Sequence, residues 1–275
     1  YEAMSKKIET KEWKPDYGPD KFNETVEKSG VTAVGARDFL IAYNVNLNTT
    51  STRRANSIAF DIREAGRIRR EGGKLDGKII KDKKGNPLRE PGMFKSVKGI
   101  GWFIKEYNIA QISYNLTDIN VSPLHLVFDK TCEQATKKGI RVTGSELIGL
   151  VPKKVLIDAG EYFLKKQKRS LGVPESEIIN IAVKSLGLDD LFDFNPKERI
   201  IEYLIEEPKE KLSSLSLTDF ANETSSESPA PGGGSISAYC GTLAASLTTM
   251  VANLSSHKRG WDDRWEFFSD WAKKS

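Results

Sequence analysis

The chain has few of the residues from which proteins build disulfide frameworks, metal sites and nucleophilic reaction centres. Among its 275 residues are two cysteines, Cys132 and Cys240, and two histidines, His125 and His257. The cysteines stand in unlike contexts, which argues against a disulfide framework and against a zinc site. We therefore predict that the protein binds no metal and works in a reducing compartment, the cytoplasm.

The two histidines belong to no recognisable catalytic cluster. His125 falls on a predicted helix without a visible partner, and His257 falls in a charged turn beside Lys258 and Arg259. The sequence has no Ser/His/Asp, Cys/His or metal-ligand spacing around either of them. Taken residue by residue, it predicts a binding site and no catalytic residue.

Long hydrophobic runs are also missing. No apolar run approaches the roughly 20 residues needed to cross a bilayer, so we expect no membrane partner. The first 12 residues are polar and charged, which predicts no signal peptide. Because the chain starts at Tyr1 without a methionine and ends at Ser275 after a Trp-rich stretch, we expect both ends to be cuts in a longer protein.

Positive charge is concentrated in one segment. The formal net charge of the whole chain is +4, but residues 67–98 alone contain 11 Lys or Arg against 4 Asp or Glu. Such a segment is most often a solvated loop, and the alternative is attraction of a polyanionic ligand. Nucleic acid is not expected as a partner, because no aromatic residue is interleaved with these charges before Phe94. We predict a hairpin that turns at Lys84-Gly85-Asn86-Pro87.

The hydrophobic pattern alternates between strand and helix periods over the first 205 residues. Residues 31–47 alternate with period two, and a helical stripe follows from Thr50 through Ala55, Ile58, Ile62, Ala65 and Ile68. The predicted fold is an α/β (α+β) sandwich, a mixed β-sheet with helices covering one face. Further strands are expected at 96–105, 109–118 and 141–151, and further helices at 122–139 (Ser122 as cap, Pro123 first in the helix), 152–166, 174–186 and 196–205.

The composition changes after Pro208. No sustained strand alternation follows, and a Ser- and Pro-rich stretch, 225–231, leads into a predicted helix that runs to about Leu254. We therefore predict an α/β domain over 1–210, a linker with a first short helix over 211–231, and the start of an all-α helical domain over 232–275.

An uncharged polar strand face is the first candidate binding site. Asn44 and Asn46 share one face of the first strand, and Gln111, Ser113 and Asn115 share one face of a later strand. Amides and hydroxyls without charge suit a partly buried floor that hydrogen-bonds a ligand. The alternative is a polar interface with a neighbouring domain.

A glycine-punctuated loop near the start is the second candidate. Glycines allow backbone N–H groups to approach a ligand closely, Phe22 offers a ring for stacking, and Arg37 offers a fork for a carboxylate. By spacing alone, an ordinary loop that leads into a strand explains the pattern equally well. The candidate residues are Gly18, Pro19, Asp20, Lys21, Phe22, Gly30 and Arg37.

A third candidate is the glycine run at the start of the long predicted helix, Gly232, Gly233, Gly234 and Ser235. Free N–H groups and the helix dipole favour an anion there. The run is neither a Walker loop nor a dinucleotide fingerprint, because no Gly-Lys-Ser/Thr follows and no strand precedes it. Small residues along the helix favour the alternative of close packing in a helix bundle.

These segments together resemble the bifunctional formiminotransferase–cyclodeaminase family, in the family's order and over nearly the whole chain. Residues 14–19 and 30–47 are similar to its folate loop and the strand that follows. The run from Ala230 to Ser235 resembles the start of the cyclodeaminase. The other matching segments are 99–102 (Gly-Ile-Gly-Trp), 110–116, 144–152 and 196–204.

The resemblance implies an enzyme, a glutamate formimidoyltransferase with part of a formimidoyltetrahydrofolate cyclodeaminase, an ammonia lyase. The transferase moves a formimidoyl group between 5-formimidoyltetrahydrofolate and L-glutamate, with N-formimidoyl-L-glutamate as the other partner, in histidine degradation. The cyclodeaminase releases ammonia and gives 5,10-methenyltetrahydrofolate. Tetrahydrofolate would be the cosubstrate, held in a tunnel between two α/β subdomains, of which this chain matches the second.

The resemblance also implies where chemistry takes place. The folate loop carries over to Gly18, Pro19, Phe22 and Gly30, the general base would precede Tyr1, and the acidic residue of the deaminase would follow Ser275. We expect a homo-oligomer, and we expect the 275 residues alone to bind folate weakly and to be inactive. The alternative is a non-catalytic scaffold module that pairs through its polar sheet face.

Overall fold

The computed structural model describes residues 6–8, 10–11, 13–73, 77–205 and 212–275. The chain divides into two compact units, Tyr1–Asp38 and Phe39–Ser275, and each is described by itself. In the first unit the structure describes α2 (Glu24–Ser29), whose N-terminus is capped by the side chain of Asn23. Gly30 ends this helix with a positive φ of 71°, a conformation that favours glycine.

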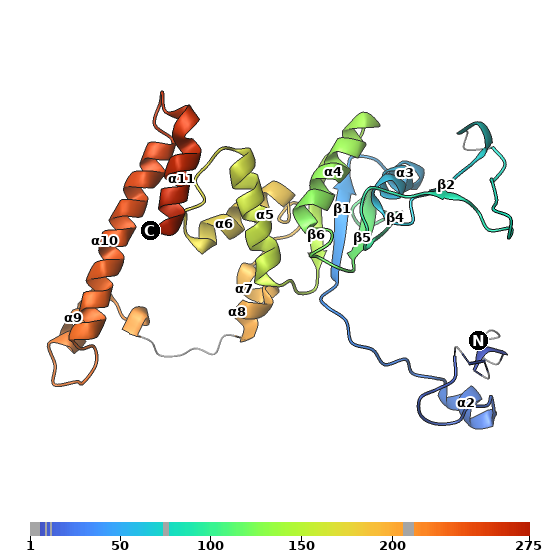
Figure 1. Cartoon of the computed structure of the whole chain (residues 1–275), viewed down its shortest axis with the longest axis horizontal. Helices are drawn as coiled ribbons and strands as arrows, with labels where there is room; N and C mark the ends of the chain where they lie inside the picture. Colours follow the sequence, from blue (N-terminus) through green and yellow to red (C-terminus); the bar gives the residue numbers. More distant parts are fainter. Residues whose placement is uncertain (1–5, 9, 12, 74–76, 206–211) are drawn as a thin grey trace. The chain divides into compact units, whose positions relative to one another are not determined.

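A four-stranded sheet forms the centre of the second unit (Figure 1). The strands are β1 (Ile41–Leu47), β4 (Val97–Ile104), β5 (Ile109–Leu116) and β6 (Val142–Ile148), in the order β4-β5-β1-β6. All three pairings are antiparallel, and an isolated bridge between Val151 and Ile200 adds a parallel contact. The alternating residues therefore present one apolar and one polar face.

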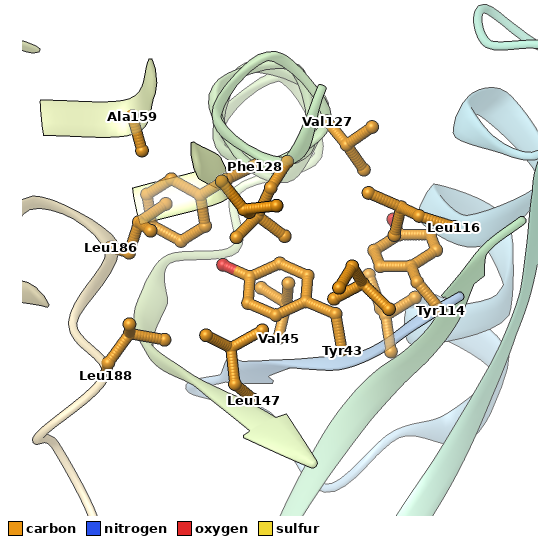
Figure 2. Packing of buried hydrophobic residues seen from close by; sticks show 14 of the residues in the cluster. Tyr43, Val45, Tyr114, Leu116, Val127, Phe128, Leu147, Ala159, Leu186 and Leu188 are labelled. Atoms are coloured by element: carbon orange, nitrogen blue, oxygen red, sulfur yellow. The ribbon is translucent and has the colours of Figure 1, made fainter. Parts of the chain in front are cut away.

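The apolar face of the sheet carries the main core. Tyr43, Val45 and Leu47 of β1 point to this face and are fully buried against α3 (Thr52–Ile62) and α4 (Leu124–Lys137). Figure 2 shows side chains from the sheet, from α4 and from the following helices meeting in one cluster. Burial of each large apolar side chain contributes about 1.5–3 kcal/mol to the stability of the fold. The apolar face is therefore held against α3 and α4, and the opposite face of the sheet remains free of these two helices.

Further helices extend the core beyond β6. α5 (Lys153–Lys166) and α6 (Glu175–Leu186) pack closely, because Gly160 leaves no room for a Cβ, which would lie 2.1 Å from the carbonyl oxygen of Ile178. Two short helices follow, α7 (Pro196–Arg199) and α8 (Ile201–Ile205). They are separated at Ile200, which has an extended backbone and forms the bridge to Val151.

The basic segment forms a two-stranded arm. β2 (Arg67–Ile68) pairs with β3 (Arg89–Glu90), with a short 3-10 turn, η1 (Glu71–Gly73), after β2. An antiparallel bridge joins Lys81 to Pro87, and the Asp82 carboxylate accepts hydrogen bonds from the backbone of Lys84 and Asn86. The predicted hairpin is confirmed, but its turn begins at Asp82, earlier than predicted, because Pro87 pairs with Lys81 instead of lying in the turn.

The chain ends in helices. η2 (Leu212–Ser214) and α9 (Leu217–Thr224) precede the long α10 (Gly233–Ser256), and α10 packs against α11 (Trp265–Lys274), which follows η3 (Asp262–Arg264). By length and composition α10 is long and apolar enough to cross a membrane, and it is little buried in this structure. The loop after α5 contacts this helix pair, because the Asn253 side chain donates to the Gly172 carbonyl at 2.8 Å.

The predicted fold class is confirmed, a helix-covered sheet followed by a helical region. Three local predictions were wrong: the start of the first strand, the end of the first long helix and the cap of α4. The first strand begins at Ile41 and not at residue 31, because residues 31–39 are exposed and pair with nothing in the described part of the chain. The first long helix ends at Ile62, so Ala65 and Ile68 lie beyond it. The predicted domain boundary near residue 210 lies outside the described residues.

The predicted cap of α4 was the third error. Ser122 donates its hydroxyl to the Lys95 carbonyl at 2.6 Å, and Pro123 occupies the cap position without a side-chain hydrogen bond. The helix therefore starts one residue later than predicted, at Leu124. Ser122 anchors the loop before β4 instead of satisfying the helix N–H groups.

Candidate functional site

The open face of the sheet, defined as the face not covered by α3 and α4, has amides at its centre. Strand register places Asn44 beside Ser113, and Asn46 beside Gln111. On the other side of β1, Asn44 lies opposite Glu146 of β6. The polar residues predicted on the two strands therefore share one face of the sheet, and this face continues onto β6.

Two of these amides, both buried, hydrogen-bond to two carboxylates, of which Glu146 is half-buried and Asp190 is exposed. The Gln111 amide donates to Asn46 Oδ1 at 2.7 Å and to Glu146 Oε2 at 2.8 Å. The Asn46 amide donates to Asp190 Oδ2 at 3.5 Å. Asn46 and Gln111 are fully buried on the polar face, outside the apolar core. We call these four residues the acid–amide cluster.

Asn44 is the unsatisfied member of the open face. Its side chain is only 7% exposed, and within the described part of the chain it has no hydrogen-bond partner. Its amide is not among the fully buried side-chain groups that lack a partner, so the amide atoms still reach solvent although most of the side chain is covered. An amide that reaches solvent at this position can donate to, and accept from, a ligand that approaches the face.

The end of α6 brings Asp190 to the cluster. Gly187 ends the helix in a left-handed conformation with φ 62°, and Ser145 of β6 donates its backbone N–H to the Gly187 carbonyl at 2.8 Å. Gly144 is required at the contact, because a Cβ there would lie 2.3 Å from Asp190 Cβ. These close approaches hold the Asp190 loop over one end of β6.

Aromatic side chains border the acid–amide cluster. Trp102 lies opposite Gln111 in the β4–β5 register and is 43% exposed. The rings of Tyr107 and Phe192 meet edge to face with centroids 5.8 Å apart. Desolvation, and then the negative charge of Glu146, raises the pKa of Tyr107, which places this ring in the electrostatic field of the cluster. Exposed aromatic surface beside hydrogen-bonding groups suits a flat heterocycle.

The structure brings together only some of the residues predicted to form the ligand-binding floor, and it adds two residues that were not predicted. Asn44, Asn46 and Gln111 are buried together, Ser113 is half-buried beside them, and Asn115 is exposed at the far end. Glu146 and Asp190 were not predicted. The position of Glu146 in the alternation of its strand could have revealed it, whereas Asp190 lies in a loop that no periodicity places.

The glycine-punctuated loop belongs to the first unit and is described by itself. Gly18 has a positive φ of 87°, and Pro19, Asp20 and Lys21 are exposed beside it. The ring of Phe22 is half-buried, and the exposed Asp20 carboxylate lies 3.9 Å from the Lys14 ammonium. Gly30 is the cap of α2, and Arg37 is exposed. Binding of a ligand by this loop stays a prediction.

The glycine run lies at a helix start, as predicted. Gly232 is the cap residue of α10 and has no side-chain cap, and Gly233, Gly234 and Ser235 form its exposed first turn. Free backbone N–H groups are therefore presented at this end. A binding role for them also stays a prediction.

The histidines are placed away from the acid–amide cluster in the structure. His125 is buried on α4, and its ring lies tilted against the Tyr162 ring with centroids 4.7 Å apart. A cavity of about 20 Å³, enough for roughly one water, adjoins it. His257 is exposed at the end of α10. Among the described residues no group of three or more His, Cys, Asp or Glu is arranged to hold a metal ion.

Comparison with known families identifies two successive regions. Residues 42–206 match the model described as "Formiminotransferase domain", and residues 216–275 match the model described as "Formiminotransferase-cyclodeaminase". The first match spans the sheet, the acid–amide cluster and α3 to α8. The second begins just before α9 and includes α10 and α11.

Individual relatives agree with these matches. The chain is 43% identical to formimidoyltransferase-cyclodeaminase of Gallus gallus over 94% of its own length, and 41% identical to that of Mus musculus over 95%. It is 36% identical to glutamate formimidoyltransferase of Thermoplasma acidophilum over 60% of its length. The chain spans 44% of the length of the first two relatives and 45% of the third.

Proposed function

The chain belongs to the formiminotransferase–cyclodeaminase family, and from this we propose that it supplies the folate-binding half of a formimidoyltransferase and the first helices of a cyclodeaminase. The whole protein would transfer a formimidoyl group between 5-formimidoyltetrahydrofolate and L-glutamate, as a step of histidine degradation. The cyclodeaminase would then act as a lyase, releasing ammonia and forming 5,10-methenyltetrahydrofolate. The names of the relatives, which include glutamate formimidoyltransferase, support this proposal.

The observation that carries the proposal is the open face of the sheet within the matched region. A pterin is a flat ring with hydrogen-bond donors and acceptors along its edges, and the open face offers unpaired amide, carboxylate and aromatic groups together. In this role the Asn44 amide would bind the ring edge, and Ser113 and Asn115 would line the rest of the face. The fully buried Asn46 and Gln111 would hold Asp190 and Glu146 in position. The residues of this chain bind and orient, and we assign no catalytic residue to it.

The glycine-punctuated loop and the glycine run take separate roles in this proposal. Gly18 to Phe22, with Gly30 and Arg37, would contribute to folate binding from the first unit. Gly232 to Ser235 would belong to the cyclodeaminase. We place the division between the two activities near residue 210, which the successive family matches at 42–206 and 216–275 support.

We propose further that the protein is cytoplasmic and forms a homo-oligomer. Both cysteines are free, which suits a reducing compartment. Large apolar side chains of α10 and α11 are exposed, among them Leu247, Val251 and Trp271, and these suit burial against further protein. Light scattering of the full-length protein tests the oligomer directly.

A transfer assay tests the central proposal. The full-length protein should transfer the formimidoyl group from N-formimidoyl-L-glutamate to tetrahydrofolate, and the 275 residues alone should bind tetrahydrofolate weakly and turn nothing over. Substituting Asn44 by alanine in the full-length protein should weaken tetrahydrofolate binding, whereas substituting the exposed Asn222 of α9 should not. Full-length protein that binds no tetrahydrofolate would refute the proposal.

A further inference from the structure

The two carboxylates of the acid–amide cluster have no cationic partner. Glu146 and Asp190 form no ion pair with any residue in the described part of the chain, although each accepts a hydrogen bond from a buried amide. Asp190 is exposed, but Glu146 is half-buried, and a half-buried carboxylate is normally matched by a positive or strongly donating group. The open face therefore has an uncompensated negative end.

An independent observation indicates that this end meets a ligand. Asn44 is more than nine-tenths buried, lies directly opposite Glu146 in the strand register, and has no hydrogen-bond partner among the described residues. Gln111 uses its amide nitrogen twice, toward Asn46 and Glu146. The Asn44 amide, which has no partner, therefore lies next to a carboxylate that has no ion-pair partner, and this leaves donor and acceptor positions side by side for a planar group.

We propose that Glu146, together with Asn44 and Asp190, is a specificity-determining site for a planar N–C–N unit that carries N–H donors. A carboxylate accepts two parallel N–H bonds from such a unit, as it does from a guanidinium, and Trp102 borders the site with an exposed ring. The inference rests on the proposed function. Two sources share this chemistry there: the 2-amino and ring N–H edge of the pterin, and the amidine of the formimidoyl group.

The alternative of a free metal ion fits less well. Two carboxylates from separate elements with amide neighbours supply few charged ligands, and no group of three or more candidate ligands occurs among the described residues. An amide and a carboxylate at paired positions of β1 and β6 favour a flat donor edge instead.

The test removes the negative charge of a carboxylate and preserves the shape of its side chain. Glu146→Gln keeps an oxygen that accepts the Gln111 hydrogen bond, so it removes the negative charge with little change in packing. Glu133→Gln, an exposed carboxylate on α4 that pairs with Lys130, is the matched control. Asp190→Asn serves as a second variant, and each variant is made in the full-length protein and checked by its thermal unfolding.

Binding is measured by calorimetry with two probes. 5-Formyltetrahydrofolate has the pterin edge without an amidine, and N-formimidoyl-L-glutamate has the amidine without a pterin. Loss of a charge-assisted hydrogen bond should weaken the affected probe about tenfold in Glu146→Gln and leave Glu133→Gln unchanged. A selective loss for the first probe assigns the site to the pterin edge, and a selective loss for the second assigns it to the amidine.

Two outcomes would overturn the inference. If wild-type protein binds both probes and Glu146→Gln and Asp190→Asn bind them equally well, the cluster does not recognise either group, and the proposed function stands. If wild-type protein binds neither probe, the proposed function fails and the inference fails with it.

Discussion

Tyr43 and Tyr114 lie opposite each other on β1 and β5 and are both fully buried, yet their hydroxyl groups differ in hydrogen bonding. The Tyr114 hydroxyl lies 3.0 Å from Thr131 Oγ1, whose own proton goes to the Val127 carbonyl, so Tyr114 donates. The Tyr43 hydroxyl has no partner with hydrogen-bonding geometry in the described part of the chain. Burial raises the pKa of both tyrosines well above the ordinary value, so both stay protonated.

The difference predicts opposite effects of the same substitution. Tyr114→Phe should lower the free energy of unfolding by about 0.5–1.5 kcal/mol, because it removes a satisfied hydrogen bond. Tyr43→Phe should leave it unchanged or raise it, because it removes a buried hydroxyl that is desolvated without compensation. Ser145, whose hydroxyl donates to the Leu186 carbonyl at 2.6 Å, also lowers the pKa of Tyr43, but it does not have hydrogen-bonding geometry with the Tyr43 hydroxyl.

Urea unfolding at neutral pH measures both variants, and equal denaturant slopes would show that they unfold by the same transition. The two substitutions remove the same atom from the same residue type at paired positions, so each is the control for the other. An equal loss of stability in both variants would contradict the assignment of the Tyr43 hydroxyl as unpaired.

A second prediction concerns the loop after α5. The Leu171 N–H donates to Ser269 Oγ at 3.0 Å, and a Cβ on Gly172 would lie 2.4 Å from the backbone carbon of Ala272. Gly172→Val should therefore separate the loop from α11 and increase hydrogen exchange in residues 265–274. Gly35→Val, at an open position, is the control. Unchanged protection of α11 in Gly172→Val would show that the loop does not hold this helix.

A third prediction is a pH dependence of stability through His125. Burial is the main cause of a pKa below the ordinary value of 6.5, the charge of Lys154 acts in the same direction, and Asp158 and Asp129 oppose it. Because the folded pKa lies below the unfolded pKa, the folded protein binds fewer protons in that window. The stability that neutral His125 contributes is therefore fully present above its unfolded pKa and is lost as the pH falls through its folded pKa.

The variant His125→Gln should accordingly lose less unfolding free energy between pH 7.5 and pH 5 than the wild type. His257→Gln, which removes the exposed histidine, should follow the wild type. Chemical unfolding at a series of pH values measures the difference. Identical pH profiles for wild type and His125→Gln would mean that His125 takes up its proton as readily in the folded state as in the unfolded state.

The sequence predicted elements well where local pattern and tertiary packing agree. The alternation through Tyr43, Val45 and Leu47 predicted a strand because a strand buries that face, and the core confirms it. Alternation alone failed at residues 31–39, since a strand also needs a partner. Ser122 failed as a cap for the same reason: its hydroxyl found a carbonyl 27 residues away in the chain, which no local rule includes.

The candidate site was predictable in part for the same physical reason. Asn46 and Gln111 lie on strands, so their period placed them on one face before the strand order was known. Asp190 reaches that face through the α6 cap and the Gly144 contact, which are tertiary facts. Without these contacts the sequence does not show that carboxylates lie on the open face. It therefore does not predict that this face prefers ligands with hydrogen-bond donors.

The last prediction concerns the basic arm. Lys81, Lys83 and Lys84 are exposed around a turn that Asp82 holds through backbone N–H groups, and hydrogen bonding to the Asn86 backbone is the main cause of the low pKa of Asp82. The lysine side chains are thus not needed for the turn. Because three lysines together attract polyanions, the arm should favour folates with a polyglutamate tail.

Replacing these three lysines by glutamine in the full-length protein should weaken binding of pentaglutamyl tetrahydrofolate more than binding of the monoglutamate. The difference should shrink as salt is raised, because exposed charges are screened over about 8–10 Å at 0.1–0.15 M ionic strength. Replacing Lys137, Lys165 and Lys168, which are exposed on or next to α4 and α5, is the charge-matched control. Equal weakening of both ligands, or none, would show that the arm does not contact the tail.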